Sequence, residues 1–181
     1  MLKRFSTLDA TFIVLMAACG IALKPVVGPM AKLIGSAFLM PSGVIAGSIY
    51  MMWPVLALLV VRRFGTAMLI GLIEGIIVLV TGFYGSHGIL SLLVYLLPCI
   101  FIDLVFLLIR NQKTTWLIFF PPAVGNIVGL LMVGVLIIHM PTIPLLISMV
   151  PGFIFGGLGG LLAWRLYALL VKSFPQFGRE N

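Results

Sequence analysis

Charged residues are scarce in this chain of 181 residues, and acidic ones above all. Four aspartates and glutamates stand against eleven lysines and arginines, and charged residues make up only 8% of the sequence. Hydrophobic residues make up 62%, and the mean hydropathy is +1.30. A soluble domain with this composition would precipitate, so that class is excluded and the fold is expected to be built in lipid.

Catalytic and metal-binding motifs are also missing. No glycine-rich phosphate loop ending in Gly-Lys-Ser or Gly-Lys-Thr occurs, so the chain is not expected to hydrolyse ATP itself. It contains no His-Glu-x-x-His, no Cys-x-x-Cys and no Gly-x-Ser-x-Gly sequence. We therefore expect a protein that is not an enzyme and has neither a metal site nor a resident cofactor.

Long apolar runs fill the chain almost from end to end. Each is close to the roughly 20 residues that a helix needs to cross a bilayer, and none alternates with the period of two that marks a barrel strand. We predict an all-α membrane protein, a bundle of six transmembrane helices that forms a single domain over residues 1–181. The predicted spans are residues 8–23, 41–61, 65–81, 88–109, 114–138 and 143–171.

Basic residues gather in every second gap between the runs. When the runs are threaded alternately through a membrane, nine of the eleven fall on one side: Lys3, Arg4, Arg62, Arg63, Arg110, Lys113, Arg165, Lys172 and Arg179. Basic loops stay in the cytoplasm, so both termini are predicted to be cytoplasmic. The net charge of +7 then sets the topology, and nucleic acid is not expected as a partner. Lys24 and Lys32 are the exceptions, in an outer loop predicted over residues 24–40 that lies across the top of the bundle.

Two carboxylates fall inside the predicted spans. An ionisable side chain in a membrane span is costly unless it faces a cavity or a partner, so both are candidate functional residues. Glu74 lies near the middle of the third span and is expected to contact a ligand, with a structural hydrogen bond between helices as the alternative. Asp103 lies in the inner half of the fourth span and is interpreted as a hydrogen-bond partner between helices, with Arg110 or Arg165 as other possible partners.

Aromatic and polar side chains accompany Glu74 in the outer half of the predicted bundle. Tyr50 and Trp53 are three residues apart and share a helical face. Stacked aromatic rings beside one buried carboxylate favour a flat, cationic or hydrogen-bonding heteroaromatic guest. We expect these side chains to line a chamber that water can reach near the outer leaflet. The predicted substrate-binding residues are Tyr50, Trp53, Glu74, Tyr84, His87 and Asn126. The alternatives are a place in the interfacial aromatic belt for the aromatic residues and a hydrogen bond between helices for Asn126.

Small residues recur every four positions on several spans. Gly152, Gly156 and Gly160 do so on the last span, and Ala18 and Ala22 on the first. Such faces let helix backbones approach closely in lipid, and most of them hold a bundle together. On the first and last spans, a smooth surface for another membrane protein is the alternative.

Two other functions fit parts of the pattern. His87 and His139 lie at the outer ends of helices and could supply axial nitrogens to a haem, with ten methionines as a soft apolar lining. The chain could also be a structural or assembly subunit of a membrane complex with no small ligand.

Between about Tyr50 and Arg110 the chain resembles a known family. The matching features are Ile49-Tyr50-x-x-Trp53, Arg62-Arg63-Phe64-Gly65, Glu74 placed 21 residues after Trp53, Gly85-Ser86-x-Gly88, and the segment from Asp103 to Arg110. They are similar to those of the substrate-capture (S) components of energy-coupling factor (ECF) transporters, a class of ABC importer. The closest branch takes up thiamine or its hydroxymethylpyrimidine moiety.

This resemblance implies partners, a cargo and a mechanism. The partners are a transmembrane coupling (T) subunit and two cytoplasmic ATPases, and the cargo is a vitamin or organic cofactor taken up across the cell membrane. The loaded S component topples in the bilayer, and an alanine face on its first helix, matched here by Ala18 and Ala22, docks on the T subunit. Thr81 and Pro98 stand where the thiamine branch has further carboxylate or amide groups, so the choice among thiamine, hydroxymethylpyrimidine and a related heteroaromatic stays open.

Overall fold

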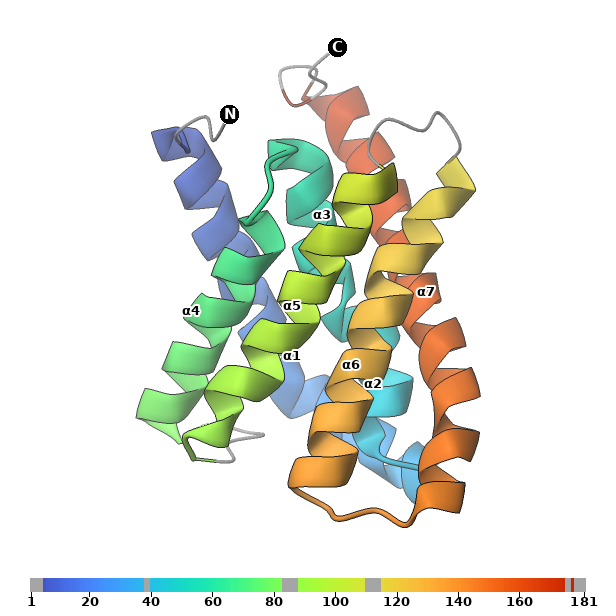
Figure 1. The fold of residues 1–181 in the computed structure, drawn as a ribbon. Helices are drawn as coiled ribbons and strands as arrows, with labels where there is room; N and C mark the ends of the chain where they lie inside the picture. Colours follow the sequence, from blue (N-terminus) through green and yellow to red (C-terminus); the bar gives the residue numbers. More distant parts are fainter. Residues whose placement is uncertain (1–4, 38–39, 83–87, 110–114, 175–176, 178–181) are drawn as a thin grey trace.

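The protein folds as a bundle of helices, as the apolar runs predict (Figure 1). The computed structural model describes residues 5–37, 40–82, 88–109, 115–174 and 177. No β-strand occurs among these residues, and the predicted all-α class is confirmed. The helices are α1 (Thr7–Ala37), α2 (Ser42–Tyr50), α3 (Met52–Val61), α4 (Thr66–Thr81), α5 (Leu90–Ile109), the 3₁₀ helix η1 (Thr115–Phe119), α6 (Phe120–Leu136) and α7 (Thr142–Ser173).

Five helical stretches of the described chain are long and apolar enough to cross a membrane. They are Thr7–Ala37, Ser42–Val61, Leu90–Ile109, Trp116–Leu136 and Thr142–Ser173. The remaining predicted span corresponds to α4, which is apolar but has 16 residues. At 1.5 Å per residue α4 is about 24 Å long, a little less than the roughly 30 Å of a bilayer's hydrocarbon core.

The chain runs back and forth along one axis. Figure 1 shows both termini and the α3–α4 turn at one end of the bundle, and the α6–α7 turn at the opposite end. We call these the terminal end and the far end. The chain therefore reverses direction from α1 to the α2–α3 pair and again at each later long helix. Lys24 of α1 and Glu74 of α4, which are 50 positions apart in the sequence, consequently lie at the same depth.

The predicted span 41–61 is divided into two helices. Met51 ends α2 and precedes α3, and its N–H donates to Gly47 O at 2.9 Å. Pro54, in the first turn of α3, has no N–H to offer to the preceding turn, which accounts for the break. Beyond it, α3 is the central element of the core, with every residue from Pro54 to Val61 buried.

The predicted outer loop over residues 24–40 is wrong. Helix α1 continues through Pro25 and Pro29 to Ala37, and Lys24 is a buried helical residue. Proline is expected to break a helix, but here tertiary packing overrides that preference. Buried positions recur every three or four residues along the whole length of α1, so one continuous face packs on the bundle: Ile13, Met16, Ala17, Gly20, Ile21, Lys24, Gly28, Ala31 and Gly35.

The glycine face of α7 packs inside the bundle. A Cβ added at Gly156 would lie 2.6 Å from Pro122 O, and one at Gly159 would lie 2.6 Å from Ser48 O. A Cβ at Gly160 would collide with Ile118 O. These glycines let α7 approach α2, η1 and α6 to backbone contact, which confirms the prediction that they hold the bundle together.

Candidate functional site

Glu74 lies on α4 with its side chain turned toward α1. The carboxylate is buried, with only 7% of the residue exposed. Gly71 and Gly75 place the neighbouring face of α4 against α5, where a Cβ at Gly71 would lie 2.5 Å from Tyr95 O. On the α1 side, Gly20 makes the necessary room, because a Cβ there would collide with Glu74 Oε1. The glycines of two helices thus create the space that the carboxylate fills.

The partner of Glu74 is Lys24 of α1. Lys24 Nζ lies 2.5 Å from Glu74 Oε2, and Lys24 is itself 4% exposed. The ammonium also lies 3.9 Å from the centre of the Tyr95 ring and 5.9 Å from that of Tyr50. Ring faces attract cations, so the two tyrosines and the carboxylate together form a site for one positive charge. The chain's own lysine occupies it.

Trp53 of α3 borders the same cluster. Its Cδ1 lies 3.6 Å from the position that a Cβ on Gly20 would take, beside the Glu74 carboxylate. The indole Nε1 is buried and has no hydrogen-bond partner among the described residues. An unsatisfied buried donor costs about 1 to 3 kcal/mol, so this N–H is a polar group ready for an acceptor.

The structure brings together three of the predicted substrate-binding residues, Tyr50, Trp53 and Glu74. It adds Lys24 and Tyr95, which the sequence analysis missed. Helix α5 starts at the far end, and Tyr95 is its sixth residue, so the cluster lies in the half of the bundle away from the termini. We name these five residues, Tyr50, Trp53, Glu74, Tyr95 and Lys24, the cation cluster.

Among the residues that the structure describes, the Glu74 carboxylate is not open to water as expected. With 7% of Glu74 and 4% of Lys24 exposed, the carboxylate is sealed by its lysine partner. The sequence analysis did not anticipate this ion pair, because it placed Lys24 in a loop rather than in α1. A signal was available, since Lys24 follows Gly20 by four residues and so falls on the same face of a helix.

Asn126 of α6 lies in a different environment. Its amide Nδ2 donates to Gly152 O at 2.8 Å and to Val44 O at 3.3 Å, so one side chain joins α2, α6 and α7. A Cβ at Gly47 would collide with this amide. Both contacts fit the interhelical role that was the alternative to substrate binding. Tyr84 and His87 lie outside the described residues, and His139 is exposed in the α6–α7 turn with a φ of 52°.

Asp103 of α5 caps a neighbouring helix. Helix α4 begins after Gly65, which has no side chain to cap it, and Asp103 supplies a cap from α5. Its Oδ2 accepts from Met68 N at 2.8 Å and its Oδ1 from Ala67 N at 3.4 Å. A carboxylate at a helix N-terminus satisfies free amides and the helix dipole, which gives Asp103 the structural role predicted for it.

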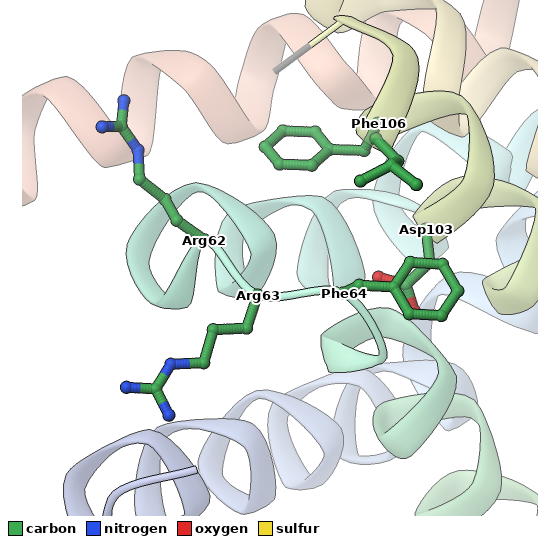
Figure 2. Close-up of a pocket in the computed structure, with 6 residues that line it drawn as sticks. Arg62, Arg63, Phe64, Asp103 and Phe106 are labelled. Atoms are coloured by element: carbon green, nitrogen blue, oxygen red, sulfur yellow. The ribbon is translucent and has the colours of Figure 1, made fainter. Parts of the chain in front are cut away.

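A shallow hollow lies next to this cap at the terminal end of the bundle. It is lined by Arg62, Arg63, Phe64, Asp103, Phe106 and Leu107. Figure 2 shows both arginine side chains extending away from Asp103. Counted with its open mouth the hollow measures about 180 Å³, which is below the roughly 300 Å³ at which pockets for small molecules begin. Arg63 instead pairs with Asp9 of α1 at 3.1 Å, so this region fastens α1 to the α3–α4 turn.

Ala18 and Ala22 lie on the outer face of α1. Both are exposed, and so are Leu15, at 53%, and Val26, at 61%. The stripe of small residues therefore faces away from the bundle, unlike the glycine face of α7. Within the described residues, no group of three or more His, Cys, Asp or Glu side chains comes together in a way that could hold a metal ion.

Comparison with known proteins gives a match to a protein family. No curated protein and no solved structure matches the chain. Residues 10–129 match a protein family described as the permease component of an ABC-type cobalt transport system. The matched segment covers more than half of the chain and contains every residue of the cation cluster. With its apolar helices, this chain is a multi-pass membrane protein, and it belongs to the family of permease components of ABC-type cobalt transport systems.

Proposed function

We propose that this permease component is the substrate-capture (S) component of an ECF importer for a vitamin or organic cofactor. The proposed cargo is thiamine, its hydroxymethylpyrimidine moiety or a related heteroaromatic. The observation that carries the proposal is the cation cluster, in which one buried carboxylate and the Tyr95 and Tyr50 rings hold a positive charge between helices. A flat cationic ring can use the same ring faces and the same carboxylate.

The arrangement of the helices supports this proposal. If α4 crosses the membrane together with the five longer stretches, the chain has six spans and both termini on one side. Arg62, Arg63 and Lys172 lie at the terminal end, which the positive-inside rule places in the cytoplasm. The cation cluster then lies in the outer half of the membrane, where an importer must capture its cargo.

Partner subunits follow from the absence of a phosphate loop in the sequence. An ABC-type transporter needs ATPases, and we propose that two cytoplasmic ATPases supply the energy of transport. We propose that a transmembrane coupling (T) subunit completes the path of the cargo across the membrane. The exposed Ala18–Ala22 face of α1 is the proposed contact with the T subunit, because small outward residues allow close approach of another helix.

The family description names cobalt, but the cation cluster favours an organic cargo. Cobalt in proteins takes several nitrogen, oxygen or sulfur ligands, whereas the cluster offers one carboxylate and a set of aromatic rings. The faces of such rings attract diffuse organic cations and are not metal ligands. We therefore propose the organic cation as cargo over the free metal ion.

Native mass spectrometry of protein purified without added ligand tests this function, because a retained mass identifies the cargo. Calorimetry with thiamine, hydroxymethylpyrimidine and cobalt(II) chloride then compares the three candidates on the same preparation. We expect saturable binding of a heteroaromatic and none of cobalt. Tight cobalt binding with no response to either organic compound would overturn the proposal. A retained haem would show that haem, rather than a thiamine-like compound, is the cargo.

A further inference from the structure

Lys24 makes the two interactions that a cationic guest of the cation cluster would make. Its ammonium is 2.5 Å from Glu74 Oε2 and 3.9 Å from the centre of the Tyr95 ring. One carboxylate cannot pair fully with two cations in so confined a space. A positively charged cargo that reaches Glu74 must therefore displace the lysine ammonium.

The position of Lys24 on α1 suits such a displacement. Pro25 follows it directly and Pro29 comes about one turn later, and neither has an N–H to donate to the preceding turn of the helix. Gly20 and Gly28 lie one turn before and one turn after it, where side chains that would stiffen the helix are absent. The lysine thus sits in the part of α1 with the weakest internal bonding, and its long stem has several rotatable bonds.

Trp53 gives independent evidence that Lys24 does not satisfy every polar group of the cation cluster. Lys24 is a donor and cannot accept a hydrogen bond, so it leaves the buried indole Nε1 without a partner. A heteroaromatic cargo has ring nitrogens that accept hydrogen bonds. A guest in place of the lysine could therefore satisfy Glu74 and Trp53 together, which Lys24 alone does not do.

We propose that Lys24 is a built-in occupant of the cargo site, and that the cargo is an organic cation carrying a hydrogen-bond acceptor which exchanges with the lysine ammonium. This inference rests on the proposed function and names its substrate class. Lys24 keeps Glu74 neutralised while the site is empty. It also makes the site prefer cationic over uncharged molecules, because an uncharged molecule cannot take over the ion pair. It lowers the apparent affinity for the cargo, because the site must first give up its own cation.

Chemical labelling of lysines tests the exchange in the unmodified protein. The purified protein is treated with an amine-acetylating reagent, with and without saturating thiamine, and modified peptides are quantified by mass spectrometry. Lys32 is the control, because it lies on the same helix and is exposed. Thiamine should raise the labelling of Lys24 by about tenfold and leave that of Lys32 unchanged. Continued protection of Lys24 in a sample that calorimetry shows to be loaded with thiamine would overturn the exchange.

Lys24→Met gives a second test, because methionine keeps an unbranched side chain but removes the charge. Without an internal competitor, the Kd for thiamine should fall by about tenfold, whereas binding of uncharged hydroxymethylpyrimidine should change little. Weaker thiamine binding would show that Lys24 contacts the cargo, and would overturn its role as an occupant.

A third measurement is independent of thiamine. Lys24→Ala opens the lysine's space while keeping Glu74, so n-propylammonium should bind there and raise the Tm of this variant. The control is Lys24→Ala combined with Glu74→Gln, which lacks the charge that attracts the cation. Equal responses of the two variants would overturn the exchange. A response specific to Lys24→Ala, in a protein that binds no thiamine, would support the exchange and reject thiamine as the cargo.

Discussion

At the scale of single residues, the Lys24–Glu74 pair needs an explanation beyond stability. Burying two charges costs several kcal/mol each, and their attraction in the interior often does no more than offset that cost. Two apolar side chains would hold α1 to α4 equally well. A pair retained at 4% and 7% exposure, between aromatic rings, is better explained by a site that must hold a positive charge.

Glu74→Gln removes this negative charge and keeps the side chain's shape. We expect thiamine affinity to fall about 5- to 150-fold, the equivalent of the roughly 1 to 3 kcal/mol that a hydrogen bond to a charged group contributes. Calorimetry measures the change. Asp103→Asn is the matched control, since it alters the other buried carboxylate, which caps α4. That variant should lose stability but keep its Kd, and an unchanged Kd in Glu74→Gln would remove Glu74 from the site.

Trp53→Phe removes the unpartnered indole N–H. Because that donor has no acceptor among the described residues, the empty protein should keep its Tm, apart from the effect of the smaller ring. The Kd for thiamine should rise by about fivefold, as expected for the loss of one hydrogen bond worth about 1 kcal/mol. Trp164→Phe is the control, because Trp164 lies on α7 beside the ring of Tyr167 of the same helix and outside the cation cluster. Equal Kd values for Trp53→Phe and the unchanged protein would show that the indole N–H does not meet the cargo.

At the scale of helices, close packing by glycine decides how the bundle is held. The α7 glycines meet backbone atoms of α2 and η1, which cannot move aside as a flexible side chain can. This arrangement matters in lipid, where packing replaces the hydrophobic effect as the force between helices. Glycines on α1 and α4 also allow close packing at the cation cluster, since Gly20, Gly71 and Gly75 let Glu74 fit between helices.

Gly159→Ala should therefore destabilise the protein. The added Cβ would lie 2.6 Å from Ser48 O and 3.2 Å from Ser48 Cα, so α7 must move away from α2. Overpacking of this kind costs about 1 to 3 kcal/mol. Gly43→Ala on α2 is the control, because nothing lies within 4 Å of its new methyl group. Thermal unfolding in detergent should give a lower Tm for Gly159→Ala than for Gly43→Ala, and the reverse order would contradict the packing.

Apart from α1, which was expected to end at residue 23 and runs to Ala37, the helices were predictable from the sequence to within a few residues. Their interruptions were not. Apolar runs reveal spans because lipid requires them, whatever the tertiary contacts. Whether a proline ends a helix depends on packing instead, and so α1 runs through Pro25 and Pro29 whereas the chain breaks before Pro54. Glu74 stood out as a charge in an apolar run. Its partner Lys24 is 50 residues away and becomes visible only when α1 packs on α4.

At the scale of the whole molecule, the ion pair of the cation cluster lies far from the basic residues of the terminal end. The core of the far half contains a neutral pair, while Arg62, Arg63 and Lys172 lie at the terminal end. Displacement of Lys24 by a cationic cargo would add one positive charge to the bundle. That charge is more easily released in a water-filled passage than in lipid, which gives a reason for release beside a partner subunit.

Contact with that partner can be tested on the outer face of α1. Ala18→Trp places a large ring on the exposed stripe and touches nothing in the cation cluster, so thiamine Kd and Tm should stay unchanged. Copurification with the coupling subunit and the ATPases should be lost, and thiamine uptake by cells should fall at least about tenfold, the effect of roughly 1.4 kcal/mol of lost binding. Ile147→Trp is the control, because Ile147 is 59% exposed on α7. Normal uptake by Ala18→Trp would place the contact on another face, because a tryptophan there cannot fit between two helices packed through small residues.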